Sequence, residues 1–139
     1  MKWVTREHVA VDRVACPWLI RRFIDQNAVF EFVPADTDPK TIKDGIPFDM
    51  KGVELGHHDG KCSFEMFIIK YQLRDPGLLE LAKIVHAADV PEDIHSTPEG
   101  AGLRAIAAGF RTICHDDHET LDKEFILYDA LYAYCKAKA

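Results

Sequence analysis

The pattern of apolar and polar positions predicts helices over most of the second half of the chain. The last segment shows the helical period most clearly, and the acids Asp116 and Asp117 at its start favour a helix N-terminus. The residues expected on its buried face are Leu121, Phe125, Tyr128, Tyr132 and Cys135. A long amphipathic helix is therefore predicted to follow these acids.

Capping residues followed by proline predict the starts of two further helices. Asp75 precedes Pro76, and Thr97 precedes Pro98. Each pair offers an N-cap side chain together with a proline at the first helical position, where the missing N–H costs nothing. One helix is therefore expected to begin at Pro76 and another at Pro98.

Three short segments have the composition of β-strands. Residues 29–33 read VFEFV, residues 2–11 predict an edge strand or an extended arm, and residues 52–58 read GVELGHH. The dipeptide Asp59-Gly60 then favours a two-residue turn and a brief return strand. The expected fold is α+β and mainly helical, with about five helices packed on a small sheet of two to four strands.

A histidine and a cysteine are predicted to share the inward face of this hairpin. Alternation along residues 52–58 places His57 on the same face as Val53 and Leu55. With a two-residue turn, Cys62 then lies opposite His57 on the return strand. Both side chains also have a purely structural reading, because buried cysteines are common and a buried histidine can bond to backbone groups.

An acid and a second histidine are predicted to face the core from one helix. Asp89 falls near the middle of the apolar stripe of residues 78–89, and His86 lies three positions earlier on the flank of that face. Residues at this spacing can reach a common point. A buried carboxylate is costly unless it is paired, so an inward Asp89 requires a partner. The alternative is that Asp89 ends the helix and faces solvent.

Together these residues predict a site for one divalent cation. Glu65 follows the hairpin and, with His57, His86 and Asp89, completes a set of two imidazoles and two carboxylates. Such ligands suit a first-row ion such as zinc, manganese or iron. Cys62 is a reserve ligand in this hypothesis, and the expected cofactor is a metal ion in a partly buried pocket.

A second predicted site is basic. A helix is expected over residues 16–25, with Pro17 in its first turn. Arg13 lies before this helix, and Arg21 and Arg22 lie along one side of it. Because a helix N-terminus favours anions, these arginines are expected to bind a small tetrahedral oxyanion. The alternative is that Arg21 and Arg22 are ordinary surface charges.

Length, charge and cysteine content narrow the class of protein. The 139 residues fit a single domain spanning residues 1–139, and the formal net charge of −6 disfavours direct nucleic-acid binding. No apolar run approaches the roughly 18 residues of a membrane span, and no export signal is recognised. Four cysteines without a CxxC pair favour reduced thiols, so a cytoplasmic protein is expected. The GxGxxG, P-loop, GxSxG and HExxH motifs are absent.

Several long stretches are too unusual in composition to follow from helix patterning alone. They are WVTREHVAVDRVACPWLIRRFID at 3–25, GVELGHHDGKCSFE at 52–65, LAKIVHAAD at 81–89, TPEGAGL at 97–103 and DDHETLDKEFILYDALYAYC at 116–135. These stretches resemble the chromate resistance protein family of the ChrB type. The resemblance implies a bacterial cytoplasmic protein linked to chromate resistance operons, whose longer members are regarded as chromate-responsive regulators with an additional N-terminal region. This chain is similar to their C-terminal domain, so direct DNA binding is not expected of it.

Three functions stay open from the sequence. The leading hypothesis is a metal-binding sensor or accessory domain of chromate resistance, with a small oxyanion such as chromate as its ligand. The second is a metal-dependent hydrolytic or redox enzyme, in which Glu54 or Glu65 is the base that acts on metal-activated water. The third is a non-catalytic partner domain, for which the aromatic C-terminal helix offers a face for a homo-oligomer.

Overall fold

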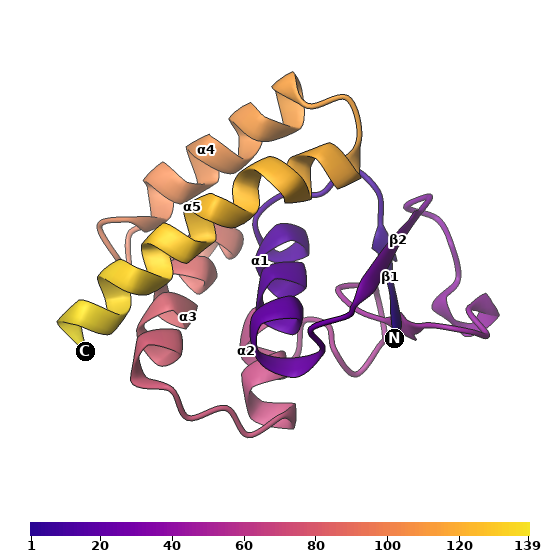
Figure 1. Cartoon of the computed structure of the whole chain (residues 1–139), viewed down its shortest axis with the longest axis horizontal. Coiled ribbons are helices and arrows are strands. Elements are labelled where there is room, and N and C mark those ends of the chain that lie inside the picture. Colours follow the sequence, from indigo (N-terminus) through magenta and orange to yellow (C-terminus); the bar gives the residue numbers. More distant parts are fainter.

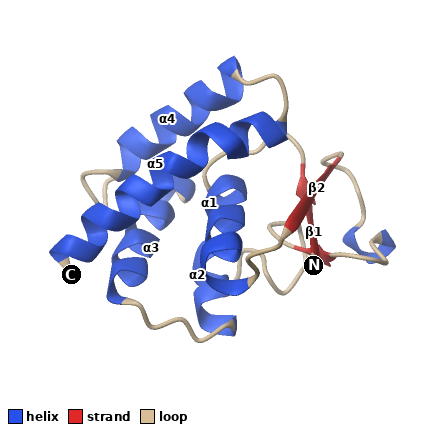
Figure 2. Cartoon of the chain, in the orientation of Figure 1, coloured by secondary structure: helices blue, strands red, loops and turns tan.

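Helices form most of the molecule, and a small sheet lies at one side of them (Figure 1, Figure 2). A computed structural model describes residues 1–139. The helices are α1 (Asp12–Leu19), α2 (Ser63–Lys70), α3 (Pro76–Asp89), α4 (Gly100–Ile113) and α5 (Asp117–Lys138). Shorter turns of helix are the π-helix η1 (Ile20–Ile24) and the 3₁₀ helices η2 (Pro39–Thr41) and η3 (Pro91–Asp93). The strands are β1 (Lys2–Arg6), β2 (Val29–Val33) and β3 (Ile46–Pro47). The predicted α+β class is confirmed.

β1 is the central strand of a parallel sheet. The strand order is β2-β1-β3, and β1 pairs with β2 along its whole length and with β3 over two residues. Trp3, Val4 and Thr5 are consecutive and all buried, as is typical of a parallel strand that is covered on both faces. The strand predicted within residues 2–11 is present, but its predicted position at an edge is wrong, because β2 and β3 pair with both of its sides.

α1 begins at Asp12, ahead of the predicted start. Pro17 lies inside the helix, where its missing N–H forfeits one intrahelical hydrogen bond. Beyond Leu19 the helix widens into η1, which is closed by a bond from the Asp25 N–H to the Ile20 carbonyl at 2.7 Å. The prediction of a helix over residues 16–25 with Pro17 in its first turn is wrong, since burial of α1 outweighs the lost bond. No helix N-terminus is therefore available beside Pro17 to hold an anion.

The segment before α2 is a series of turns and not the predicted strand. Asp59 and Gly60 do form the predicted two-residue turn, with φ of 52° and 78°. His58 and Lys61 exchange backbone hydrogen bonds of 3.2 and 2.8 Å across it. Pairing stops after this single bridge because the return segment turns directly into α2, so His58 alone of residues 52–58 has a bridge partner.

α3 and α5 begin where the capping signals predict. Asp75 and Asp116 each accept a hydrogen bond from the backbone N–H three residues further on, at 3.1 and 2.9 Å. α4 begins at Gly100, two residues after the predicted start at Pro98. Thr97 nevertheless accepts a hydrogen bond from the Gly100 N–H at 3.1 Å, so its hydroxyl tightens the turn that leads into the helix.

α5 packs against three other helices, α1, α3 and α4. Figure 1 shows α5 crossing α1 and running beside α4, and its contacts with α3 are extensive. Its predicted face is buried at Leu121, Phe125, Tyr128 and Cys135 and partly buried at Tyr132. Trp18 of α1 is fully buried beneath this face and donates a hydrogen bond to Asp129 at 2.7 Å.

Gly100 of α4 packs tightly against Ala87 of α3. A β-carbon added at Gly100 would lie 2.6 Å from the β-carbon of Ala87, whereas one at Gly109 in the same helix would meet nothing within 4 Å. We expect Gly100→Ala to lower the free energy of unfolding by about 1–3 kcal/mol through overpacking. Gly109→Ala should raise it by about 0.5–1 kcal/mol, because alanine is the better helix former. Urea denaturation measures the change in the free energy of unfolding for each variant. A Gly100→Ala variant as stable as wild type would contradict the close packing.

Glu124 of α5 is a buried carboxyl group without a partner. The residue is 0% exposed, and neither carboxylate oxygen has a hydrogen-bond partner. Burial raises the pKa of Glu124 to about 7. Because the native state holds this proton more tightly than the unfolded chain, the stability that protonation provides is lost as pH rises from about 4.5 through 7.

We therefore expect Glu124→Gln to gain stability relative to wild type between about pH 5 and about pH 8. The change should be about 2–3 kcal/mol, since one pKa unit corresponds to about 1.4 kcal/mol and most of the titration falls between these pH values. Urea unfolding at the two pH values gives this difference, and Asp122→Asn on the exposed side of the same helix is the control. A difference between wild type and Glu124→Gln that does not change with pH would show that Glu124 is not buried as a neutral acid.

Candidate metal centre

Asp12 is a fully buried carboxylate that joins two helices. It lies in the first turn of α1, and its two oxygens accept hydrogen bonds from the backbone N–H groups of Ser63 and Phe64 at 2.7 and 3.1 Å. These N–H groups open α2 and have no partner within that helix. Asp12 therefore stabilises the N-terminus of a helix whose first residue, Ser63, follows it by 51 positions in the sequence.

The imidazole of His57 lies against three carboxylates. Its Nε2 is 3.0 Å from Asp89 Oδ2, 3.3 Å from Asp12 Oδ2 and 3.5 Å from Asp49 Oδ1. The four residues come from the start of α1, the loop before α2 and the last residue of α3. The structure thus brings His57 and Asp89 together, and the alternative in which Asp89 faces solvent is wrong, since its side chain is only 17% exposed.

His57 is not turned into the core as the strand pattern predicts. Its side chain is 51% exposed, because the ring reaches from the surface loop toward the buried carboxylates. Cys62 does not face it across a hairpin. The return strand is absent, and Cys62 instead forms the N-cap of α2 and turns toward another group of ligands.

Asp49 connects this cluster to arginine side chains. Its carboxylate pairs with Arg13 at 3.3 Å and with Arg6 at 3.6 Å, and it accepts a hydrogen bond from the Ser63 hydroxyl at 2.6 Å. Sequence reasoning missed both Asp12 and Asp49. Asp12 would have been found from the correct start of α1, whereas nothing in the loop sequence around Asp49 indicates that it turns inward.

Burial raises the pKa of two of the three carboxyl groups. It is the main cause for both Asp12 and Asp89, and the pKa of Asp89 rises to about 7. Burial alone would also raise the pKa of Asp49, but hydrogen bonds, that from His57 first, lower it. Hydrogen bonds to Asp12 and Asp49 raise the pKa of His57 to about 10. His57 is therefore a cation at neutral pH, while burial disfavours the charged forms of Asp12 and Asp89.

A pocket of about 470 Å³ adjoins the cluster. Its lining includes the acids Asp49 and Asp89, the arginines Arg13, Arg104 and Arg111, and small residues of α4. Burial lowers the pKa of Arg13, and the nearby charge of Arg111 contributes to this shift. No ion pair neutralises Arg104 or Arg111. The sequence signal for these two is their spacing of seven, which places both on one face of α4.

The three predicted arginines do not gather at one place. Arg13 lines the pocket beside the acidic cluster, whereas Arg21 donates a hydrogen bond to the Ala28 carbonyl at 2.9 Å. Arg22 forms two hydrogen bonds with Asp129, at 3.0 and 2.9 Å. Arg21 and Arg22 thus have partners of their own, because α1 starts earlier and places them in the turn that leads to β2.

The four predicted metal ligands fall into two groups. His57 and Asp89 belong to the first group with Asp12, while Glu65 and His86 belong to the second with Cys62. Glu54, considered as a catalytic base, is 70% exposed and pairs with Lys70. The four predicted ligands therefore do not surround one common ion position.

Comparison with known proteins assigns the chain to a family. The family model of the ChrB C-terminal domain matches residues 3–135. Protein ChrB of Cupriavidus metallidurans is 37% identical over 136 residues, which cover 96% of this chain and 40% of that protein. The chain belongs to the ChrB C-terminal domain family, and the resemblance seen in the sequence is confirmed.

No solved structure matches the chain. None of the helices combines the length and apolar character that crossing a membrane requires. The chain spans only 40% of the length of the curated relative that it matches.

Proposed function

We propose that this chain is a metal-binding sensor or accessory domain of chromate resistance, which holds one divalent cation between Asp12, His57 and Asp89. The observation that carries the proposal is the spacing of the ligand atoms around His57. Two ligands that each lie about 2.1 Å from an ion are separated by about 3.0 Å at octahedral and about 3.4 Å at tetrahedral angles. His57 Nε2 lies 3.0 Å from Asp89 Oδ2 and 3.3 Å from Asp12 Oδ2.

The charges of the cluster favour an ion over a structural ion pair. Asp49 is already neutralised by Arg13 and Arg6. The only cationic group that pairs with Asp12 or Asp89 is the imidazole of His57, so two buried carboxylates face one positive charge. Leaving buried carboxylates without compensation is costly. A divalent cation bound to a neutral His57 balances both.

The ligand types indicate which ions suit the site. Two or three carboxylates with one imidazole and no thiolate favour manganese, iron or zinc in the divalent state. Asp89 also lines the pocket of about 470 Å³, so an ion at this place has a coordination position open to the pocket. An open position is what a ligand-sensing or water-binding ion requires.

The arginines of the pocket supply the partner for an oxyanion. Arg104 and Arg111 are exposed to the pocket without ion-pair partners, and Arg13 has a buried Nε without a hydrogen bond. Guanidinium groups bind oxyanions through paired, charge-assisted hydrogen bonds. A tetrahedral dianion such as chromate, the anion that the family resemblance implies, would lie between the cation and these arginines.

The cation is tested with Mn²⁺, whose preference for oxygen and nitrogen ligands matches this site. We expect wild type to bind Mn²⁺ and to abolish the EPR signal of the free ion. His57→Ala and Asp89→Asn should each weaken binding by at least about tenfold, because each removes a direct ligand. His95→Ala, which removes an exposed histidine, is the control and should bind as wild type does. Equal binding in all four proteins, or none by wild type to Mn²⁺, Fe²⁺ or Zn²⁺, would remove the proposal.

The oxyanion is tested by titrating chromate, and sulfate of the same shape and charge, into the cation-loaded protein. Loss of one charge-assisted bond is worth about 1.5–3 kcal/mol, so Arg104→Ala and Arg111→Ala should each weaken chromate binding by about tenfold or more. Arg74→Ala, outside the pocket, is the matched control. Calorimetry that finds the same affinity in all the variants would place the anion elsewhere.

A further inference from the structure

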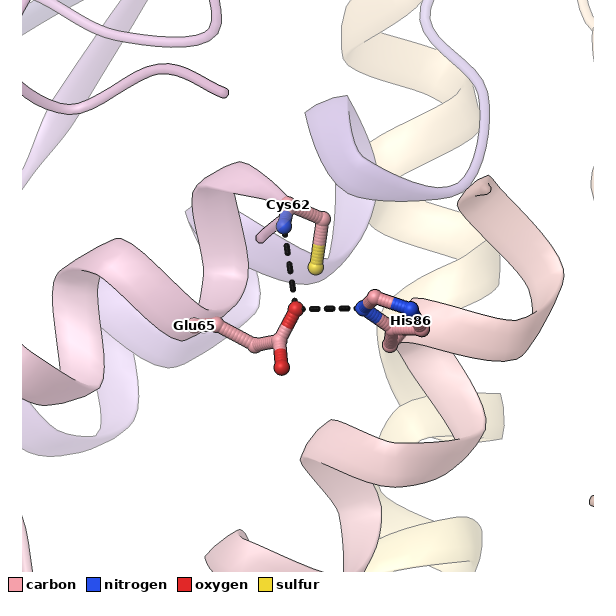
Figure 3. Close-up of side chains that lie close together, drawn as sticks. All are labelled: Cys62, Glu65 and His86. Carbon is pink, nitrogen blue, oxygen red and sulfur yellow. Dashed lines mark hydrogen bonds and ion pairs between the residues drawn. The ribbon is translucent and has the colours of Figure 1, made fainter. Parts of the chain in front are cut away.

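We propose that the chain has a second metal site, formed by Cys62, Glu65 and His86, for a thiolate-binding ion of the Zn²⁺ type. One ligand atom from each of the three residues lies within 4.8 Å of the others. Figure 3 shows the sulfur, the carboxylate and the imidazole turned toward one another. The set is separate from the Asp12, His57 and Asp89 group and shares no residue with it.

The start of α2 places two of the ligands by local geometry. Cys62 is the N-cap residue and Glu65 lies at the third helical position, so the two residues form a capping box. Glu65 Oε1 accepts a hydrogen bond from the Cys62 N–H at 2.9 Å. Its Oε2 has no partner and is left to bind an ion. Helix capping therefore fixes the thiol and the carboxylate side by side, whatever else the site does.

His86 approaches the same place from α3, with its ring held on both sides. Its Nδ1 lies 2.6 Å from Glu65 Oε1, and its Nε2 lies 2.7 Å from Asp93 Oδ2 in the 3₁₀ helix η3. Zinc-binding histidines regularly donate their second ring N–H to a carboxylate, which fixes the tautomer and the orientation of the ring. Asp93 has this position, so it directs Nδ1 toward Cys62 and Glu65.

The site can exchange a proton for a cation. At 2.6 Å, a proton lies between His86 Nδ1 and Glu65 in the metal-free chain, as in any imidazole–carboxylate hydrogen bond. Binding of a cation displaces this proton and the thiol proton of Cys62, and the sulfur, the nitrogen and a carboxylate oxygen become ligands. Three protein ligands leave the fourth position of a tetrahedral zinc ion open to another ligand.

The two sites are expected to select different ions. The Asp12, His57 and Asp89 group offers oxygen and nitrogen atoms, whereas the second site adds a thiolate, which favours Zn²⁺ over Mn²⁺. His86 and Asp89 are three residues apart on α3 but belong to different sites. Loss of one site therefore does not require loss of the other.

The experiment uses Co²⁺ as a spectroscopic substitute for Zn²⁺ in the full chain. A cobalt–thiolate bond gives a sulfur-to-metal charge-transfer band in the near ultraviolet, which oxygen and nitrogen ligands do not give. We expect this band in wild type and in His57→Ala, and we expect added Zn²⁺ to remove it. Cys62→Ser and His86→Gln should lack the band, while Cys135→Ser, which changes another buried cysteine, should retain it.

Asp93→Asn keeps the test decisive if Cys62→Ser fails to fold, because the Asp93 side chain is 48% exposed and is not itself a ligand. It should retain the band but weaken Co²⁺ binding by about 10–100-fold, as changes behind a ligating histidine do. Absence of a charge-transfer band in Co²⁺-loaded wild type would overturn the second site, and so would a band that persists in Cys62→Ser. Either result leaves the Mn²⁺ binding of the first site unaffected.

Discussion

The buried carboxylate of Asp12 is the interaction on which the arrangement of the site depends. It accepts hydrogen bonds from two backbone N–H groups at the N-terminus of α2, and it lies beside His57 and the end of α3. A carboxylate at a helix N-terminus is favoured by the free N–H groups and by the helix dipole. The same contact that joins α1 to α2 therefore places a negative charge where Asp49 and Asp89 add two more.

Helix capping also explains why two ligands of the second group, Cys62 and Glu65, lie close together. Cys62 and Glu65 are oriented by the first turn of α2, directly beside the N–H groups whose hydrogen bonds Asp12 accepts. Two candidate metal sites thus adjoin one helix terminus, and α3 contributes one ligand to each of them. In the lining of the adjoining pocket, three arginines supply positive charge. This division of charge is the basis of our proposal that the chain binds a cation and an oxyanion side by side.

The sequence predicts the features that local chemistry decides. The caps at Asp75 and Asp116, the turn at Asp59-Gly60 and the buried face of α5 all depend on neighbouring residues, and all are confirmed. The inward position of Asp89 was also predictable, because helical periodicity fixes it. The start of α1 was not, since Pro17 is a strong local signal that tertiary packing overrides.

The grouping of the ligands needed the three-dimensional structure. His86 and Asp89 lie three residues apart on one helix, and periodicity alone suggests a common target. Their partners come from Glu65 and from Asp12, whose positions depend on how α1 and α2 meet. Whether a cation binds at His57 can be seen in a crystal structure of the Mn²⁺-loaded protein, with anomalous scattering recorded at the manganese edge. We expect an anomalous peak bonded to His57 Nε2 and to oxygens of Asp12 and Asp89. Absence of the peak, with His57 still in direct contact with Asp89, would show that no cation binds there.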